Sequence, residues 1–517
     1  MDRRQFLEIA TALSTGTALS EVAGALDSSF DPAERSLADL QQALATGTVS
    51  SEQLVGAYLQ RIARFDQAGP SLRCVLALNP SALADARVKD LERRNRMRKG
   101  PLHGIPLLIK DNIETCDPVA TTAGSLALAN SHRPADAPLV ARLRSAGAIV
   151  LGKSNLSEWA NLRSTHSCSG WSALGGQTRN AYDRDRNPSG SSAGSGVAAA
   201  ASFCAGAIGT ETNGSILSPA SVNGLVGLKP TVGVVSGQGI VPISPRQDTA
   251  GPMCRTVADA ALLAQVIAGR PLGFGTHAAD LEAFRLSGVR VGAMPLSPGG
   301  HPGTEALYAR AREVFRREGA VLVDLQHPAP MTEMGTAQLE TLLFDFKWAI
   351  QAYLSTLDPV QVPSRTLAGL IRFNRAHAAE ELSVFGQELF EMAEARGPLS
   401  DPAYQKALAT LQRAADVEGL TKLFNDSSVE VLLAPSNGPA DLIDAVWGDR
   451  GEGGWPPIAD AAAIAGFPSI TVPAGLVAGL PVGITLVARR NQDGLLLLVA
   501  RAFERAAGAR VPPTLKA

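Results

Sequence analysis

Lys110 is the first residue whose type and position indicate chemistry. It follows the apolar run of residues 105–109 and precedes Asp111 and Asn112. A lysine buried at the end of a strand loses hydration, which lowers its pKa and lets the neutral amine accept a proton near neutral pH. In a second interpretation its ammonium pairs with Asp111 or Glu114 at the strand end. The residue alone therefore predicts either a proton acceptor or a structural ion pair.

A serine in a turn-forming segment offers a reactive hydroxyl. In the segment Thr212-Asn213-Gly214-Ser215-Ile216 the serine directly follows a glycine. Such a turn can direct successive backbone N–H groups at one point and so form an oxyanion hole beside the Ser215 hydroxyl. A small-residue turn that allows close helix packing is the alternative.

The stretch "NPSGSSAGSG", residues 187–196, contains a match to the G-x-S-x-G pattern, with Ser192 in the nucleophile position. That pattern works when the serine stands on a sharp turn between a strand and a helix. The preceding residues, "RNAYDRDRNPS", are polar and turn-forming, so the required strand is missing. We therefore expect no hydrolase elbow at Ser192.

A phosphate-loop pattern also occurs, from Gly147 to Ser154, in "GAIVLGKS". A nucleotide-binding loop needs exposed residues between its two glycines, so that backbone N–H groups can surround phosphates. Residues 148–151 are apolar instead and predict a buried strand that ends near Lys153. A nucleotide-binding protein stays open as the alternative from another functional class.

These segments together resemble the amidase signature family, the Ser-Ser-Lys hydrolases. The resemblance rests on "LLIKDNI", "GSSAGSG" and "GTETNGSILSPAS", with Ser191 and Ser215 twenty-four positions apart. It implies that Ser215 is the acyl-forming nucleophile, Ser191 a relay and Lys110 the base. It further implies a cis peptide bond between Gly190 and Ser191, and an oxyanion hole formed by backbone N–H groups. These groups belong to Thr212, Asn213, Gly214 and Ser215.

Within this family the chain is similar to bacterial peptide amidases, on segments such as "NLSEWANLRS", "GWSALGGQTRN" and "LLFDFK". The resemblance implies hydrolysis of C-terminal peptide amides, or of other uncharged acyl amides, without cofactor or metal. Leu217 stands where many relatives have an arginine, which weakens the alternative of a glutamine-hydrolysing transamidosome subunit. Asn213 stands where close relatives often have an aspartate.

The elements that must position these residues alternate between strand and helix. Apolar periodicity predicts helices within residues 36–66, 138–145 and 196–207, and strands at 105–110, 148–151, 429–434 and 469–487. This alternation indicates an α/β core, which the resemblance makes an amidase signature fold with a large twisted mixed sheet flanked by helices. Residues 305–425 predict an added helical cover on a single domain spanning residues 26–517.

The first 25 residues carry Arg3-Arg4, a weakly apolar run and Ala23-Gly24-Ala25, which is typical of a twin-arginine signal peptide. We expect a periplasmic or secreted protein, with a cytoplasmic one as the alternative. The net charge of −2 without a basic cluster argues against nucleic acid as a partner. No apolar run is long enough to span a membrane. The scattered histidines and five cysteines predict no metal site.

Overall fold

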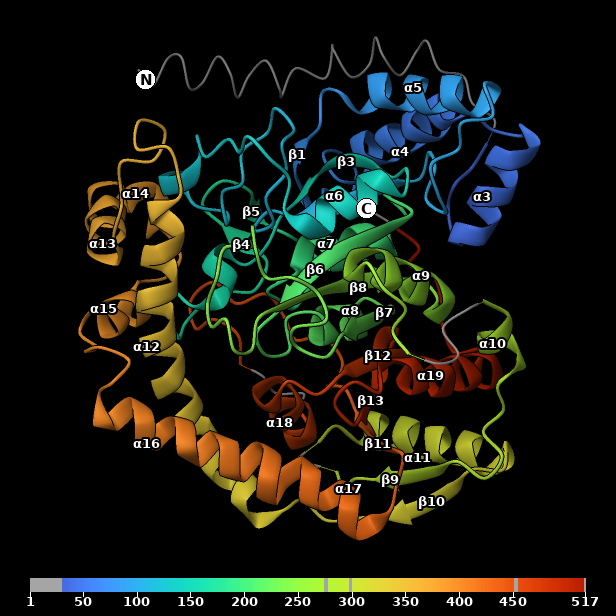
Figure 1. Ribbon diagram of the computed structural model, residues 1–517, viewed down its shortest axis with the longest axis vertical. Helices are drawn as coiled ribbons and strands as arrows, with labels where there is room; N and C mark the ends of the chain where they lie inside the picture. Colours follow the sequence, from blue (N-terminus) through green and yellow to red (C-terminus); the bar gives the residue numbers. More distant parts are fainter. Residues whose placement is uncertain (1–29, 274–277, 297–299, 451–453, 516–517) are drawn as a thin grey trace.

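The computed structural model describes residues 30–273, 278–296, 300–450 and 454–515. The expected signal peptide, residues 1–25, lies outside these residues and stays a prediction. The described part is built on an 11-stranded mixed sheet with helices on both sides (Figure 1). This arrangement agrees with the α/β core that the alternating sequence pattern predicts.

The strands of the large sheet follow the order β1-β3-β2-β6-β8-β7-β12-β13-β11-β9-β10. Their bounds are β1 Val75–Leu78, β2 Pro106–Lys110, β3 Ile149–Ser154, β6 Gly206–Glu211, β7 Val226–Lys229, β8 Thr249–Cys254, β9 Arg290–Ala293, β10 Val321–Asp324, β11 Val431–Pro435, β12 Ser469–Val477 and β13 Leu480–Ala488. A separate small hairpin consists of β4 Trp171–Ser172 and β5 Gly176–Gln177.

Helices make up the other regular elements of the described residues. Those on the N-terminal side are α3 Leu37–Thr46, α4 Ser51–Phe65, α5 Ala82–Arg94, α6 Pro138–Ser145, α7 Ala193–Ala200, α8 Leu217–Val222, α9 Val257–Ala268 and α10 Ala278–Ala283. The rest are α11 Pro302–Arg317, α12 Met334–Ser355, α13 Leu367–Ala376, α14 Ala378–Glu381, α15 Glu388–Glu394, α16 Pro402–Leu411, α17 Lys422–Ser427, α18 Pro457–Ala465 and α19 Asp493–Ala507. The four short stretches of other helix types are η1 Leu126–Leu128, η2 Glu158–Asn161, η3 Ala329–Glu333 and η4 Gln412–Thr421.

The centre of the sheet holds the segments that carry the candidate residues. Strand β2 lies between β3 and β6 and is parallel to both. Every residue of these three strands is buried, as expected for a sheet covered by helices on both faces. Because the three strands are parallel, their carboxyl ends meet at one edge of the sheet. Lys110 ends β2 there, and Glu211 ends β6.

The helical prediction for residues 305–425 is correct in the main and wrong at one point. Strand β10 lies inside this range and pairs in parallel with β9, which in turn pairs with β11. The helix predicted over residues 196–207 also differs, because α7 spans Ala193–Ala200 and Gly206 already belongs to β6. Both differences concern short apolar segments whose neighbours in space decide between helix and strand.

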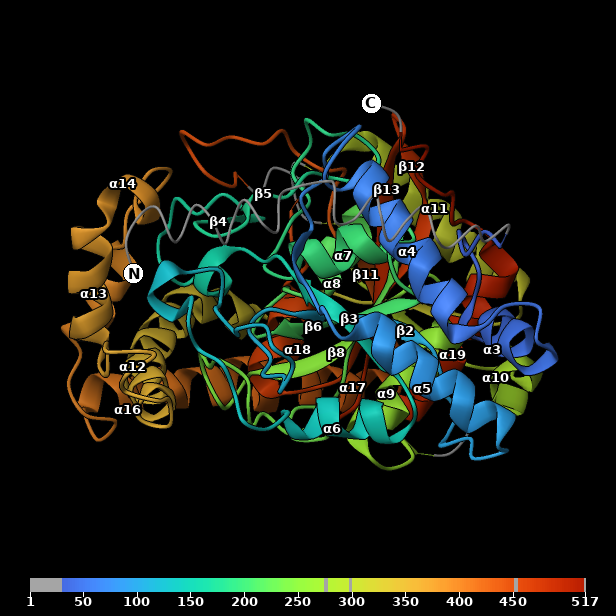
Figure 2. The same ribbon diagram turned by 90° about the horizontal axis from the view of Figure 1, so that it is seen from above.

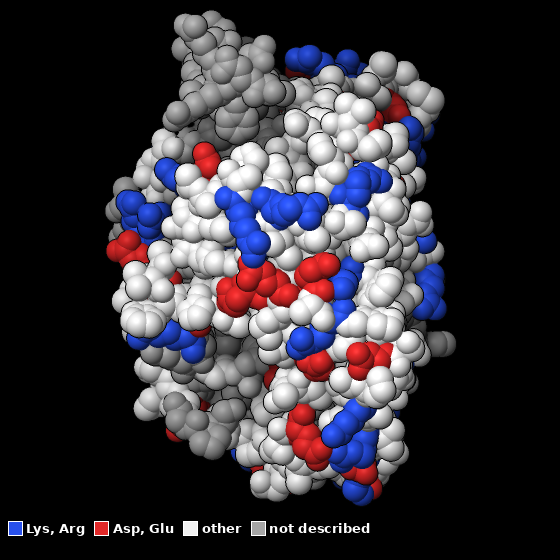
Figure 3. Space-filling view, turned by 90° about the vertical axis from the view of Figure 1, so that its left-hand side faces the viewer, with Lys and Arg blue, Asp and Glu red and all other residues white. Residues whose placement is uncertain are grey.

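Helices α12 to α16, called here the helical cover, stand beside the sheet rather than on its central strands (Figure 2). Within this cover, α12, α13 and α15 form a second hydrophobic core with η1 and η2. Trp159 meets Phe390 edge to face there, with ring centroids 5.6 Å apart. Figure 3 shows the outer face on this side, where Lys and Arg side chains lie among Asp and Glu side chains. In the described part of the chain, no helix combines the length and apolar character that crossing a bilayer requires.

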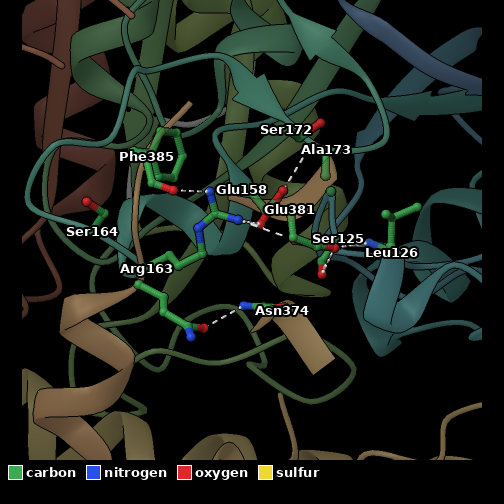
Figure 4. Close-up of polar contacts among 12 residues, drawn as sticks. Ser125, Leu126, Glu158, Arg163, Ser164, Ser172, Ala173, Asn374, Glu381 and Phe385 are labelled. Carbon is green, nitrogen blue, oxygen red and sulfur yellow. Dashed lines mark hydrogen bonds and ion pairs between the residues drawn. The ribbon is translucent and has the colours of Figure 1, made fainter. Parts of the chain in front are cut away.

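A buried charge cluster joins the helical cover to the central part of the molecule (Figure 4). The fully buried guanidinium of Arg163 forms ion pairs with Glu158 and, over 3.3 Å, with Glu381 of α14. It also stacks on Phe385 at 4.2 Å. The other oxygen of Glu381 accepts hydrogen bonds from the Ser125 hydroxyl at 2.9 Å and from a backbone N–H. Burial raises the pKa of Glu158 well above its usual range.

Candidate active site

Lys110 lies at the carboxyl end of β2 with no exposed surface. Its Nζ donates hydrogen bonds to Ser191 Oγ and to Thr210 Oγ1, each over 2.9 Å. Burial lowers the pKa of Lys110 from 10.5 to about 7, although the carboxylates of Glu211 and Asp248 act in the opposite direction. A substantial fraction of this lysine is therefore neutral at physiological pH and can accept a proton.

The ion-pair interpretation of Lys110 is wrong. The carboxylate of Asp111 pairs instead with Lys153 of the neighbouring strand, 3.0 Å away, and Glu114 pairs with Arg133 over 2.8 Å. Lys153 also donates to the Thr121 hydroxyl. In the described part of the chain, the polar contacts of the Lys110 amine are with oxygen atoms of Ser191 and Thr210 and with no carboxylate.

Ser191 lies immediately before α7, and the peptide bond between Gly190 and Ser191 is cis, as the family resemblance implies. The Ser191 carbonyl accepts a hydrogen bond from the Ser157 N–H over 3.0 Å. A Cβ atom at Gly190 would lie 2.2 Å from the Ser157 hydroxyl and 2.7 Å from the Ser169 hydroxyl. The close approach of the backbone at position 190 to Ser157 and Ser169 therefore requires glycine there.

The Ser192 hydroxyl binds the backbone of strand β6. Its hydroxyl donates to the Thr210 carbonyl over 3.0 Å and accepts from the Thr210 N–H over 3.2 Å. Together these bonds fix the start of α7 to strand β6. The chain just before Ser192 forms turns and no strand, so the absence of a hydrolase elbow is confirmed.

Ser215 lies in the turn that connects β6 to α8, and 8% of its surface is exposed. Its carbonyl accepts a hydrogen bond from the Ser192 N–H over 3.2 Å, so the two serine segments lie side by side. Gly214 adopts a left-handed conformation with φ of 77°, which favours glycine. The Glu211 carboxylate accepts from the N–H groups of Ile216 and Leu217, over 2.8 and 3.0 Å, and fixes the end of this turn.

The remaining residues of the turn are held by their side chains. The Thr212 hydroxyl donates to Asp248 over 2.6 Å, and the Asn213 amide donates to Asp460 over 3.0 Å. Burial raises the pKa of each of these two carboxyls to about 6. Within the described residues, the backbone N–H groups of Asn213, Gly214 and Ser215 form no hydrogen bond to a protein acceptor. These donors are therefore available to an oxygen atom placed beside Ser215.

A cavity of about 410 Å³ opens beside both serine segments. Ser189 and Gly190 line one part of it, and Asn213 and Gly214 line another. The helical cover contributes Gln338 and Leu342 of α12. A further part of the lining comes from residues 437–441, 449 and 454–455, which were not predicted from the sequence. Their polar loop pattern gave no sign of a contact with segments more than 200 positions away.

Of the two departures from the family pattern, Asn213 lies in the Ser215 turn and lines the cavity. Leu217 is fully buried at the start of α8 and is not among the cavity-lining residues. The residues of the phosphate-loop match form strand β3, whose six residues are all buried. This strand leaves no loop that could surround phosphates, so the match indicates no nucleotide site. Among the described residues, no group of His, Cys, Asp and Glu side chains is placed to hold a metal ion.

Comparisons with known proteins find relatives over most of the chain. The sequence profile of the Amidase family matches residues 53–497. A probable amidase of Arabidopsis thaliana is 37% identical over 511 residues, covering 94% of this chain and 93% of the relative. The A subunit of a glutamyl-tRNA(Gln) amidotransferase from Chloroflexus aurantiacus is 34% identical over 501 residues, covering 90% of this chain and 95% of the relative.

Two solved structures of peptide amidases are similar over nearly their whole length. The native enzyme of Stenotrophomonas maltophilia is 46% identical with a TM-score of 0.87, covering 94% of this chain and 99% of that chain. A peptide amidase in complex with the competitive inhibitor chymostatin is 47% identical with a TM-score of 0.88, covering 93% and 99%. Both share the large mixed sheet flanked by helices. The chain belongs to the amidase family and is an amide-hydrolysing enzyme.

Proposed function

We propose that this amidase releases ammonia from the C-terminal carboxamides of peptides through a Ser215-Ser191-Lys110 triad and an acyl-enzyme. The contact that carries the proposal is the 2.9 Å hydrogen bond between Lys110 Nζ and Ser191 Oγ, in a site where burial lowers the lysine pKa to about 7. A serine hydroxyl is a weak nucleophile and needs a base within hydrogen-bond reach. Lys110 supplies that base through Ser191.

In the first half of the reaction, neutral Lys110 accepts the Ser191 proton while Ser191 accepts the proton of Ser215. The Ser215 oxygen forms a bond to the amide carbon, and the carbonyl electrons move onto its oxygen. The N–H groups of residues 212–215 stabilise this oxyanion, and one good donor of this kind is typically worth about 3 kcal/mol. As the carbon–nitrogen bond breaks, the leaving nitrogen takes the proton back from the relay.

The second half of the reaction repeats these transfers with water as the nucleophile. Water gives one proton to the relay and adds its oxygen to the acyl carbon. The bond between that carbon and Ser215 then breaks, and the serine oxygen regains a proton. The free acid leaves, and the protonation states of Lys110, Ser191 and Ser215 are those of the starting enzyme. No other reactant is needed.

The peptide-amide substrate is supported by the similarity to the two peptide amidases over more than nine-tenths of this chain. The cavity beside the serines is of a size that small-molecule and peptide-end sites commonly have. A second candidate is a glutamine-hydrolysing transamidosome subunit, favoured by the 34% identity to the amidotransferase of Chloroflexus aurantiacus. Against it, position 217 is a buried leucine, which offers no charge to a zwitterionic glutamine.

Mass spectrometry of the products from a panel of peptide amides and glutamine tests this proposal. We expect each peptide amide to gain a free C-terminal acid, and glutamine to remain intact. The Ser215→Ala variant removes one hydroxyl from the site and should keep its fold by circular dichroism while losing turnover. Turnover retained in that variant, or hydrolysis of glutamine alone, contradicts the proposal.

A further inference from the structure

The charged residues that line the cavity beside the serines are all acidic. Three carboxylate residues line it, Asp441, Asp449 and Asp460. Among the described lining residues there is no lysine and no arginine. A carboxylate that enters such a cavity loses water without gaining a cationic partner, whereas a cation gains attraction from the wall.

Three asparagines that line this cavity have side-chain oxygens without a protein partner in the described part of the chain. The Oδ1 atoms of Asn161, Asn213 and Asn437 are buried and have no hydrogen-bond partner among the described residues. The Asn213 amide is held in one orientation, because its Nδ2 donates to the Asp460 carboxylate over 3.0 Å. The Nδ2 atoms of Asn161 and Asn437 donate to the hydroxyls of Ser169 and Ser218 over 3.1 and 3.0 Å. Buried acceptors without a partner are uncommon and costly, so they favour a ligand that brings N–H donors.

Asp449 is the carboxylate most firmly tied to the reacting segment. Its Oδ1 accepts from the Ser169 N–H over 2.9 Å and from Asn187 Nδ2 over 2.7 Å. Asn187 in turn accepts from the Ser189 N–H over 2.7 Å, two positions before Ser191. These bonds hold the side chain of Asp449 at the cavity wall. Because the side chain is already ordered, little of its conformational entropy is lost when a ligand binds.

From these observations we infer that the cavity binds a positively charged group rich in N–H donors, an ammonium or a guanidinium, on the amide substrate. The inference rests on the proposed function, because it assigns this group to a substrate whose carbonyl reaches Ser215. The sequence predicts an uncharged acyl group, whereas the cavity favours a cationic acyl group. An anionic group at the same place is disfavoured by the three carboxylates and by the unpartnered amide oxygens.

Binding to the Ser215→Ala protein separates recognition from turnover. We would measure the dissociation constants of N-acetyl-alanyl-arginine amide, its citrulline analogue and its glutamate analogue by titration calorimetry. Citrulline has nearly the shape of arginine and no charge. We expect the arginine peptide to bind about tenfold more tightly than the citrulline peptide, and the glutamate peptide to bind more weakly than either.

Two further variants in the same background locate the effect. Asp449→Asn keeps an oxygen acceptor for Ser169 and Asn187, and it should reduce the arginine-to-citrulline ratio severalfold. Asp401→Asn is the matched control, because Asp401 likewise accepts from a backbone N–H, that of Ala403, and does not line the cavity. It should leave the ratio unchanged.

Equal affinity for the arginine and glutamate peptides overturns the inference. An arginine-to-citrulline ratio in Asp449→Asn equal to that in the Asp401→Asn control overturns it as well. A failure of the proposed function is a different result. In that case the wild-type enzyme releases no ammonia from any of the three peptides, whatever their affinities. The binding ratios therefore test the cavity, and the release of ammonia tests the triad.

Discussion

Replacing Lys110 by methionine should remove activity and, at neutral pH, stabilise the fold. The lysine pKa is 10.5 in the unfolded chain and about 7 in the folded protein. The unfolded state therefore binds the proton over this interval and the folded state does not, so stability rises as the pH rises from 7 to 10.5. Below pH 7 the burial of the lysine costs about 5 kcal/mol, and above pH 10.5 this cost is absent.

The methionine variant loses two hydrogen bonds, to Ser191 and Thr210, which together contribute about 2 kcal/mol. At pH 7 the relieved burial cost exceeds this loss, and we expect a gain of about 2–3 kcal/mol in the free energy of unfolding. At pH 10 most of the burial cost has gone, so the variant should be no more stable than the wild type. Ammonia release should fall by at least about a hundredfold at every pH.

Urea unfolding followed by tryptophan fluorescence at pH 7 and pH 10 measures both values. Lys153→Met is the matched control, since Lys153 is a second fully buried lysine on the next strand and is paired with Asp111. It leaves a buried carboxylate without its partner and should destabilise the fold by about 3–5 kcal/mol at pH 7. An equal loss of stability for both variants at pH 7 would refute the reasoning.

Three other substitutions test separate parts of the account. Glu211→Gln removes a charge that raises the pKa of Lys110, so the acid limb of the kcat/KM profile should move to lower pH; a shift to higher pH contradicts this. Ser192→Ala should cost about 1–2 kcal/mol of stability and much less turnover than Ser215→Ala; the reverse ranking of activities would restore the elbow at Ser192. Arg163→Met leaves Glu158 and Glu381 buried without a cation and should lower the free energy of unfolding by about 3–5 kcal/mol. Lys422→Ala, at an exposed ion pair on α17, serves as its control and should change little.

The central elements of the sheet were predictable from the sequence because their patterns are local. Strand β2 and helix α6 match the predicted ranges closely, since a run of apolar residues before Lys110 and a helical period at residues 138–145 each favour one structure. The placement of Lys110, Ser191 and Ser215 near one another followed from the family resemblance. Their spacing alone left several interpretations open.

What escaped prediction depends on contacts between distant segments. The pairing of Asp111 with Lys153 follows from the parallel register of β2 and β3, in which Ile109 stands opposite Lys153. The cavity wall around Asn437 and Asp449 forms only when the loop that contains Asp449 reaches Asn187, 262 positions earlier in the chain. The sequence pattern contains no period or spacing for contacts of this kind.

The most direct test of the central claim is to locate the nucleophilic serine of the enzyme. The protein would be incubated with a fluorophosphonate, which reacts with activated serines, and then digested and sequenced by mass spectrometry. We predict an adduct on Ser215 that is absent in the Lys110→Met variant. An adduct on Ser191 or Ser192 in place of Ser215, or labelling of Ser215 at the same rate without Lys110, would contradict the triad.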